Sequence, residues 1–231
     1  MATRSALKTI LRQLEPYGAC DVADALTRLK HPYGGFVSGL KLRSPSPTQG
    51  KILGPAFPVL FERNEHKATK PSVSGHYIDA IPKDTVLFLS APPDLPNAVY
   101  GGIMSARLKH VGALGTVVDG RIRDIDEQIA LEWPVFSRDL GTTAGAELCF
   151  ASQLNVPVPL QSPSRPGVMV HPGDILVGDA NGLVAIPSAL AEEVVRILPE
   201  LAEVDRQCLE DVKAGRPVAE TFKERRGRLR C

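Results

Sequence analysis

The most constraining feature of this sequence is a regular alternation of apolar runs and helical stretches through its middle. The short run Thr85–Ser90 is almost entirely apolar, as expected of a strand buried on both faces. A helical stretch follows Gly101-Gly102, a second apolar run spans Ala113–Val118, and a second helical stretch spans Ile125–Leu131. Strands that alternate with helices pair in parallel through crossover connections, so this region predicts an α/β fold.

The segments on either side predict further layers around that unit. Two helices are expected within about residues 5–30, and a proline-containing strand, Ile52–Phe61, is expected to lie at a sheet edge or to be irregular. A helix over about residues 188–213, with Ser188 as its N-cap, closes the chain. Before it, four short runs predict a small antiparallel or mixed β layer: Asn155–Leu160, Val168–Val170, Ile175–Gly178 and Leu183–Ile186. No linker or repeat interrupts this order, so residues 1–231 are interpreted as one layered domain.

Composition excludes several classes of protein. The 27 basic residues nearly balance the 26 acidic ones, so there is no basic field for nucleic-acid binding. No apolar run approaches the ~20 residues that span a bilayer, and the N-terminus lacks a hydrophobic signal core. The four cysteines are scattered, which disfavours a thiolate zinc site or a disulfide framework. A soluble, cytoplasmic protein is therefore expected.

The segment Val117–Asp126, VVDGRIRDID, has the pattern of a buried strand that ends in a site. Gly120 is expected to form the turn at the strand end. Beyond it, Arg123 offers a bidentate clamp for an anionic oxygen, and Asp124 offers a carboxylate for a hard divalent cation. The alternative is a surface ion pair or a carboxylate that caps the next helix. Asp119, Arg121 and Asp126 are the other charged residues of this constellation.

A second candidate site is the glycine pair that precedes the first helix of the alternation. Gly101, Gly102, Ile103 and Met104 would present free backbone N–H groups to a small carboxylate. The pattern is neither GxGxxG nor a P-loop, and the alternative is a tight turn that needs glycine. One helix and one strand separate this pair from Arg123, so both loops should meet at one edge of the sheet.

The remaining polar residues give weaker signals. Asp174, Asp179 and Asn181 are candidate metal or water ligands, with hairpin-turn chemistry as the alternative. The histidines show no metal-ligand spacing, and no serine, cysteine or lysine stands in a recognisable nucleophile setting.

The ordered motifs resemble the RraA-like family, which includes class II 4-hydroxy-4-methyl-2-oxoglutarate aldolases. The motifs are GGIMSARLKHVGALGTVVDGRIRDIDE, WPVFSRDLGTTA, NVPV and VHPGDILVGDANGLVAIP. The resemblance implies a layered β/β/α sandwich like the swivelling phosphohistidine domain, assembled as a homotrimer or dimer of trimers. It also implies Mg²⁺ or Mn²⁺ held by Asp124, a 2-oxo acid bound by Arg123, and a carboxylate cradle at Gly102–Met104.

The chain also departs from the family pattern. Many of the aldolases carry an acidic residue where this chain has Gly102, and the GGIM form resembles the fungal branch of the family. The resemblance further implies an acidic residue from a neighbouring subunit, for which Glu192 and Glu193 are the candidates.

Together these features predict a divalent-metal lyase that cleaves a C–C bond of small 2-oxo acids through a pyruvate enolate. The expected activities are 4-hydroxy-4-methyl-2-oxoglutarate aldolase, oxaloacetate decarboxylase, or both. One alternative is an RraA-like enzyme that acts on a larger β-hydroxy or β-keto substrate in a specialised pathway. Another is a non-catalytic, partner-binding trimer.

Overall fold

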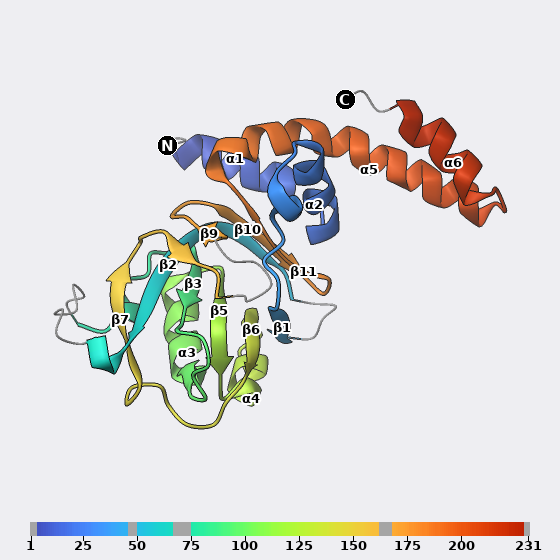
Figure 1. Cartoon of the computed structure of the whole chain (residues 1–231). Helices are drawn as coiled ribbons and strands as arrows, with labels where there is room; N and C mark the ends of the chain where they lie inside the picture. The colour runs from blue at the N-terminus through green and yellow to red at the C-terminus, as the bar shows by residue number, and fades with distance from the viewer. Residues whose placement is uncertain (1–3, 46–49, 67–74, 162–167, 229–231) are drawn as a thin grey trace.

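A mixed β-sheet forms the centre of the protein. The computed structural model describes residues 4–45, 50–66, 75–161 and 168–228. Within them, a nine-stranded sheet has the order β1-β6-β5-β3-β2-β10-β11, with β4 beside β5 and β7 beside β2 (Figure 1). Its strands are β1 (Lys41–Ser44), β2 (Ile52–Arg63), β3 (Val86–Ser90), β4 (Ala98–Tyr100), β5 (Gly115–Ile122), β6 (Val135–Leu140), β7 (Cys149–Leu154), β10 (Ile175–Asp179) and β11 (Gly182–Ile186). A short pair, β8 (Val158–Pro159) and β9 (Met169–Val170), lies apart from this sheet.

The predicted parallel pairing is confirmed in the middle of the sheet. Strands β2, β3, β5 and β6 are parallel neighbours, and β4 pairs in parallel with β5. The α/β fold class is therefore confirmed. The predicted C-terminal β layer appears as the β10–β11 hairpin, which joins the same sheet by antiparallel pairing of β10 with β2.

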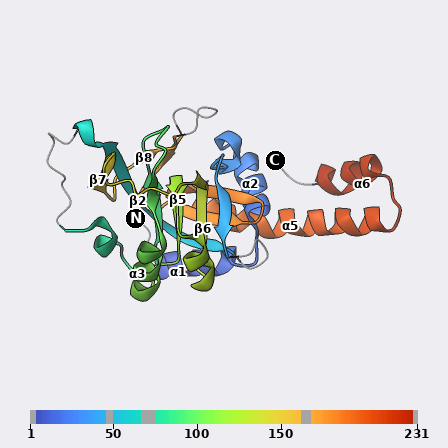
Figure 2. The same ribbon diagram turned by 90° about the horizontal axis from the view of Figure 1, so that it is seen from below.

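Two groups of helices cover the sheet. Helices α3 (Gly102–Val111) and α4 (Ile125–Ala130) lie against its parallel part, whereas α1 (Arg4–Leu14) and α2 (Ala19–Arg28) lie beside α5 (Ala191–Lys213) over β10 and β11 (Figure 1). Helix α5 extends beyond the body of the protein, and α6 (Val218–Arg225) turns back along it (Figure 2). None of the helices that the structure describes is long and apolar enough to cross a membrane.

The strand that contains Pro55 and Pro58 was expected to lie at a sheet edge or to be irregular; β2 lies inside the sheet, with a register shift against β7 between Leu60 and Phe61. It pairs with β3 on one side, while on the other side β10 pairs with residues 52–55 and β7 with residues 59–63. The change of partner between these two stretches leaves room for residues that lack a backbone N–H. Two prolines are thereby tolerated in a strand with neighbours on both sides.

Two local predictions were wrong. Gly120 does not turn the chain, because β5 continues to Ile122 with a register shift against β6 between Val118 and Arg121. Glycine is needed there because a Cβ would lie 2.9 Å from the Cβ of Ala91. Ser188 is not the N-cap of the long helix: it begins a 3₁₀ turn, Ser188–Leu190, and α5 starts at Ala191.

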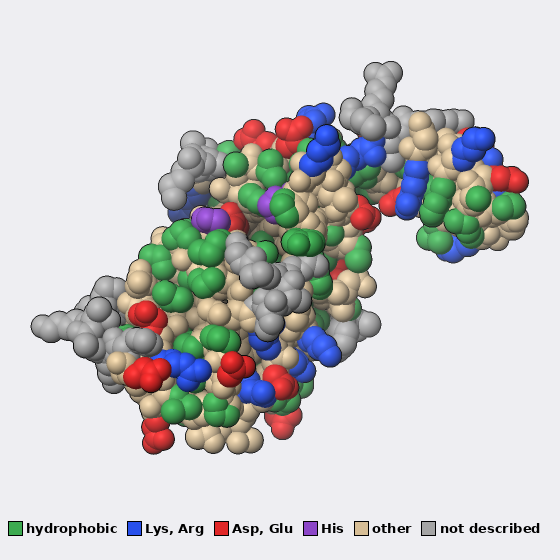
Figure 3. All heavy atoms as spheres, in the orientation of Figure 1, with side chains coloured by type: hydrophobic (Ala, Val, Ile, Leu, Met, Phe, Trp, Pro, Cys, Tyr) green, Lys and Arg blue, Asp and Glu red, His purple; other side chains and the backbone are tan. Residues whose placement is uncertain are grey.

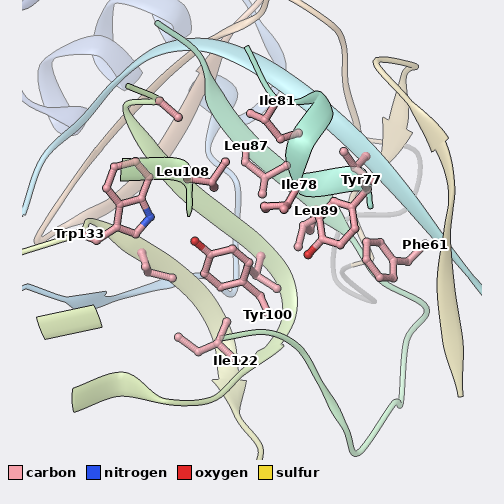
Figure 4. Close-up of a cluster of buried hydrophobic side chains, with 14 of the residues drawn as sticks. Phe61, Tyr77, Ile78, Ile81, Leu87, Leu89, Tyr100, Leu108, Ile122 and Trp133 are labelled. Atoms are coloured by element: carbon pink, nitrogen blue, oxygen red, sulfur yellow. The ribbon is translucent and has the colours of Figure 1, made fainter. Parts of the chain in front are cut away.

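The largest buried cluster lies between the sheet and α3. Leu87 and Leu89 of β3 pack there with Leu108 of α3, and Tyr100 and Trp133 complete the cluster (Figure 4). Two of its polar side chains are joined through Thr116: the Tyr100 hydroxyl lies 2.9 Å from the Thr116 hydroxyl, which also accepts a 3.0 Å bond from the Trp133 indole. This network fixes the end of β4, where the chain enters α3.

A buried ion pair joins β5 to β6. The Asp119 side chain is fully buried and accepts hydrogen bonds from the Arg138 guanidinium and the backbone N–H of Gln161. Burial raises the pKa of Asp119, although Arg138 opposes that shift. The Arg138 guanidinium therefore offsets the cost of burying the negative charge of Asp119.

We expect Arg138→Met to lower the free energy of unfolding by about 3 kcal/mol, because it leaves a buried charge without a partner. Adding Asp119→Asn should recover at least half of that loss. The loss should also shrink as the pH falls, because the buried acid then takes up a proton that the unfolded state binds less readily. Urea unfolding measures all three effects. Arg121→Met is the control, since its partner Asp139 is exposed; equal losses in the two single variants would contradict the assignment.

Candidate active site

The candidate site forms where the parallel strands β4 and β5 end. The backbone N–H of Arg123 donates a 3.0 Å hydrogen bond to the carbonyl of Tyr100, which brings the end of β5 against the start of α3. Burial raises the pKa of Tyr100 to about 12, although hydrogen bonds with Ser105, Thr116 and Trp133 lower it. The phenol therefore stays neutral and acts as a structural anchor beneath the site.

Asp124 connects the two predicted loops directly. Its backbone is left-handed, with φ 60° and ψ 44°, a conformation that Asp tolerates better than most residues. The carboxylate makes no cap for its own helix α4, and instead accepts a 3.1 Å hydrogen bond from the backbone N–H of Gly102 in α3. The alternative that Asp124 caps its own helix is therefore wrong; its carboxylate instead binds the first residue of the neighbouring helix α3.

The glycine pair is required by the approach of these carboxylates. A Cβ at Gly101 would lie 2.5 Å from Oδ2 of Asp124. A Cβ at Gly102 would lie 1.8 Å from Oε2 of Glu127. Neither glycine has a positive φ, so close approach rather than turn geometry explains why both side chains are absent.

Glu127 is a site residue that the sequence reasoning missed. It stands in the first turn of α4, three residues after Asp124, and its carboxylate fills the space that a side chain at position 102 would occupy. Among the described residues, its carboxylate has no hydrogen-bond or ion-pair partner. The available signal was the spacing of Asp124 and Glu127, which places side chains on the same face of a helix.

Arg123 lies beside Asp124 and remains partly exposed. Its Nε is 3.6 Å from Oδ2 of Asp124, and its Nη1 donates a 3.4 Å hydrogen bond to the carbonyl of Thr142. The Arg123 carbonyl accepts a 2.8 Å bond from the side chain of Gln128, which holds the backbone in place. With 41% of its side chain exposed, the guanidinium is accessible to an anion.

These residues border a pocket of about 460 Å³. Gly101, Ile103, Met104, Arg123 and Asp124 line it, so the structure brings both predicted constellations together. Gly102 lies just behind this lining, with its N–H turned to Asp124. The other walls are mainly apolar side chains from β2, β7 and the 3₁₀ turn Tyr77–Ala80.

Other predicted residues do not join this pocket. Asp119 and Arg121 border a separate cavity of about 220 Å³ with Arg138 and Asp139. Asp126 is exposed on α4 and does not line the main pocket.

The candidate ligands in the C-terminal turns have structural roles. Asp174 accepts hydrogen bonds from the backbone N–H groups of His171 and Ser188. Asp179 accepts bonds from Ala19 at the start of α2 and from Asn181 in its own turn. The turn-and-cap alternative therefore explains these residues better than metal ligation.

Glu192 and Glu193 lie in the first turn of α5, which runs beside α1 and α2 and away from α3 and α4 (Figure 1). Glu193 is paired with Arg196 at 2.6 Å. Within one chain, these acids do not approach Asp124.

Asp124, the Arg123 guanidinium and the start of α3 meet at the pocket, whereas the Glu127 carboxylate lies beside Gly102, outside the pocket lining. No cluster of three or more His, Cys, Asp or Glu side chains arranged for metal binding occurs in the part of the chain that the structure describes. Mg²⁺ commonly binds one or two carboxylates and keeps several water ligands, so Asp124 and Glu127 suit that ion. Together with the fold, this pocket defines an α/β protein with a candidate site for a small anion and a divalent cation.

The family follows from comparison with known proteins. A model of the RraA-like family, described as Aldolase/RraA, matches residues 19–185. The chain belongs to the RraA-like family, as its motifs predicted.

Individual relatives agree with this placement. Over 177 residues the chain is 33% identical to a putative 4-hydroxy-4-methyl-2-oxoglutarate aldolase of Halalkalibacterium halodurans, covering 76% of this chain and 74% of the relative. It is 28% identical over 189 residues to protein DlpA of Legionella pneumophila, covering 82% of this chain but only 29% of DlpA. A solved structure of an uncharacterized Pseudomonas syringae protein has a TM-score of 0.78 and 27% identity, covering 93% of this chain and 96% of that protein.

The hydrogen bond from Gly102 to Asp124 gives a stability prediction. Asp124→Ala should lower the free energy of unfolding by about 1 kcal/mol, because the N–H of Gly102 loses its acceptor. Asp124→Asn should cost less than half as much, since an amide oxygen can accept the same bond and Asn tolerates the left-handed backbone. Thermal and urea denaturation of both variants provide the measurement, and equal losses would show that the hydrogen bond contributes nothing.

Proposed function

We propose that this protein is a divalent-metal-dependent lyase that cleaves a C–C bond of 2-oxo acids to release pyruvate. The observation that carries the proposal is the meeting of Arg123, Asp124 and the N-terminus of α3 at one pocket. The Arg123 guanidinium can bind an anionic substrate there, and the carboxylates of Asp124 and Glu127 can bind a cation. The aldolase name carried by a relative at 33% identity supports a lyase within this family.

In this proposal, Asp124 and Glu127 hold Mg²⁺ or Mn²⁺ together with water. The ion, when bound, supplies positive charge that polarises the substrate's keto group. Asp124 is fixed by the Gly102 N–H, so one of its oxygens is oriented before any ligand arrives. Glu127 has no competing cation among the described residues, which leaves its carboxylate available.

Arg123 and the start of α3 bind the substrate. The carboxylate of a 2-oxo acid fits the positive end of α3 at Ile103 and Met104, and the guanidinium faces the oxygen on which charge develops. When the C3–C4 bond of a 4-hydroxy-2-oxo acid breaks, its electron pair passes to the pyruvate fragment as an enolate. Oxaloacetate decarboxylation gives the same enolate, so one site can serve both reactions.

Glu127 is the group we assign to proton transfer. Cleavage requires loss of the proton from the C4 hydroxyl, and the enolate must then gain a proton at C3 to become pyruvate. The Glu127 carboxylate stands over Gly102, beside the start of α3, and is exposed to solvent. It is placed to accept the proton directly or through a water molecule, and so to replace an acidic side chain at position 102.

We also propose that the chain acts as a homotrimer or dimer of trimers. Large apolar side chains are exposed on the α5–α6 arm, namely Leu209, Val218 and Phe222, and Ile103 beside the pocket is 77% exposed. On the face shown in Figure 3, basic and acidic side chains are interspersed, and apolar side chains are exposed on the arm as well as on the body. A neighbouring subunit that covered these residues could bring Glu192 or Glu193 to the site.

The activity is tested with the purified full chain and 4-hydroxy-4-methyl-2-oxoglutarate or oxaloacetate. Pyruvate release should require Mg²⁺ or Mn²⁺, stop with EDTA, and fall by at least about 100-fold in Asp124→Asn, a variant that keeps the hydrogen-bond acceptor. Thermal shift with Mg²⁺ plus oxalate provides an activity-independent readout. A metal-independent protein without oxalate binding would instead support a non-catalytic, partner-binding trimer.

The role of Glu127 has a separate test. Glu127→Ala should reduce the rate of pyruvate release by about 100-fold and weaken Mg²⁺ binding measured by calorimetry. Asp126→Ala, an exposed neighbour on α4, is the matched control. Equal behaviour of Glu127→Ala and Asp126→Ala would remove Glu127 from the mechanism.

A further inference from the structure

The pocket beside Arg123 has a second part, which we name the apolar lobe. Its walls are Phe61, Tyr77, Met104, Cys149, Phe150 and Ala151. The Phe61 and Tyr77 rings meet edge to face, with centroids 5.2 Å apart, and lie together at one side of the buried cluster (Figure 4). Two strands and a 3₁₀ turn thus build a wall of rings and aliphatic groups next to a charged site.

The apolar lobe lacks a charge for a second carboxylate. Among the described residues that line the pocket, Arg123 is the one Lys or Arg side chain. His76 also lines it, but its ring stacks on Tyr77 and its Nδ1 accepts a 3.3 Å hydrogen bond from the backbone N–H of Ile78. Burial raises the pKa of Cys149 to about 11, so this thiol stays uncharged at neutral pH.

The apolar lobe also offers more room than a pyruvate unit needs. The whole pocket measures about 460 Å³, within the range of sites that hold drug-sized ligands. Its charged groups, Arg123 and Asp124, lie together beside Gly101 and would bind the 2-oxo acid end, whereas the far part of the pocket has uncharged polar groups such as the Tyr77 hydroxyl. The rest of the pocket volume is therefore available to the substituent that the substrate carries beyond its reacting carbons.

We propose that the physiological substrate is a 2-oxo acid whose far end is an uncharged aromatic or branched aliphatic group seated in the apolar lobe. This inference rests on the proposed function and specifies its substrate class. In the aldol reaction, the C3–C4 bond breaks, the C4 hydroxyl loses its proton, and the apolar fragment leaves as an aldehyde or ketone. The other fragment takes a proton at C3 and leaves as pyruvate, so no oxidant or reductant is needed.

Binding tests the apolar lobe without relying on catalysis. Calorimetry of the full chain with Mg²⁺ should show phenylpyruvate binding at least about tenfold more tightly than 2-oxoglutarate, because burying a ring is favourable whereas a second carboxylate finds no partner. Equal affinities, or tighter binding of 2-oxoglutarate, would overturn the proposal.

Substitutions in the wall should reverse the preference. Ala151→Arg and Ala151→Lys each place a cation in the apolar lobe, so both should lose phenylpyruvate affinity and gain 2-oxoglutarate affinity. Gln153→Arg, an exposed position on the same strand that does not line the pocket, is the matched control. Thermal melting shows whether each variant is folded, and using two variants keeps the test valid if one of them misfolds. Unchanged preference in both folded variants would place the apolar group elsewhere.

The two proposals can fail separately. If phenylpyruvate is preferred but no 2-oxo acid is cleaved, the result supports the apolar lobe as a binding site and contradicts the lyase function. If pyruvate is released equally well from 4-hydroxy-2-oxo acids with a 4-phenyl or a 4-carboxymethyl group, the result supports the lyase function and contradicts the proposed substrate preference of the apolar lobe.

Discussion

The hydrogen bond between the Gly102 N–H and the Asp124 carboxylate is the contact on which the arrangement of the site depends. It joins the loop after β4 to the loop after β5, and parallel pairing of these strands brings the two ends close enough for it to form. The left-handed backbone at Asp124 directs the carboxylate away from its own helix. A small local cost in backbone conformation is thus balanced by a bond that orients the acid before any ligand is present.

Carboxylates from neighbouring residues occupy the space beside the glycine pair, where the chain has no side chain at position 102. Asp124 occupies the approach to Gly101, and Glu127 occupies the approach to Gly102. A carboxylate carried by the next helix can fill the space of one carried by the helix start, because α3 and α4 begin at neighbouring strand ends. The chemistry of such a site depends on where the oxygen lies and much less on which residue carries it.

Much of the fold was predictable because its parallel strands and helices are built from local patterns: the apolar run before Ser90, the glycine pair before α3 and the strand through Val117. Features set by distant partners were not. Gly120 resembled a turn, but its need for glycine comes from Ala91, the residue that follows the neighbouring strand β3. Pro58 resembled an edge signal, but the partner change along β2 accommodates it. Glu127 and the apolar lobe likewise depend on contacts between segments far apart in the sequence.

The division of the pocket between two structural units has a consequence for substrate choice. The charged end is built by β4, β5 and the starts of α3 and α4, whose positions are fixed by the parallel sheet and the buried Tyr100 network. The apolar lobe is built largely by β2, β7 and the turn that carries Tyr77. Under the proposed function, we expect substitutions at Ala151 to change the group that the pocket accepts without moving Arg123 or Asp124. A fold with this division can retain one bond-breaking step while the far end of its substrate varies.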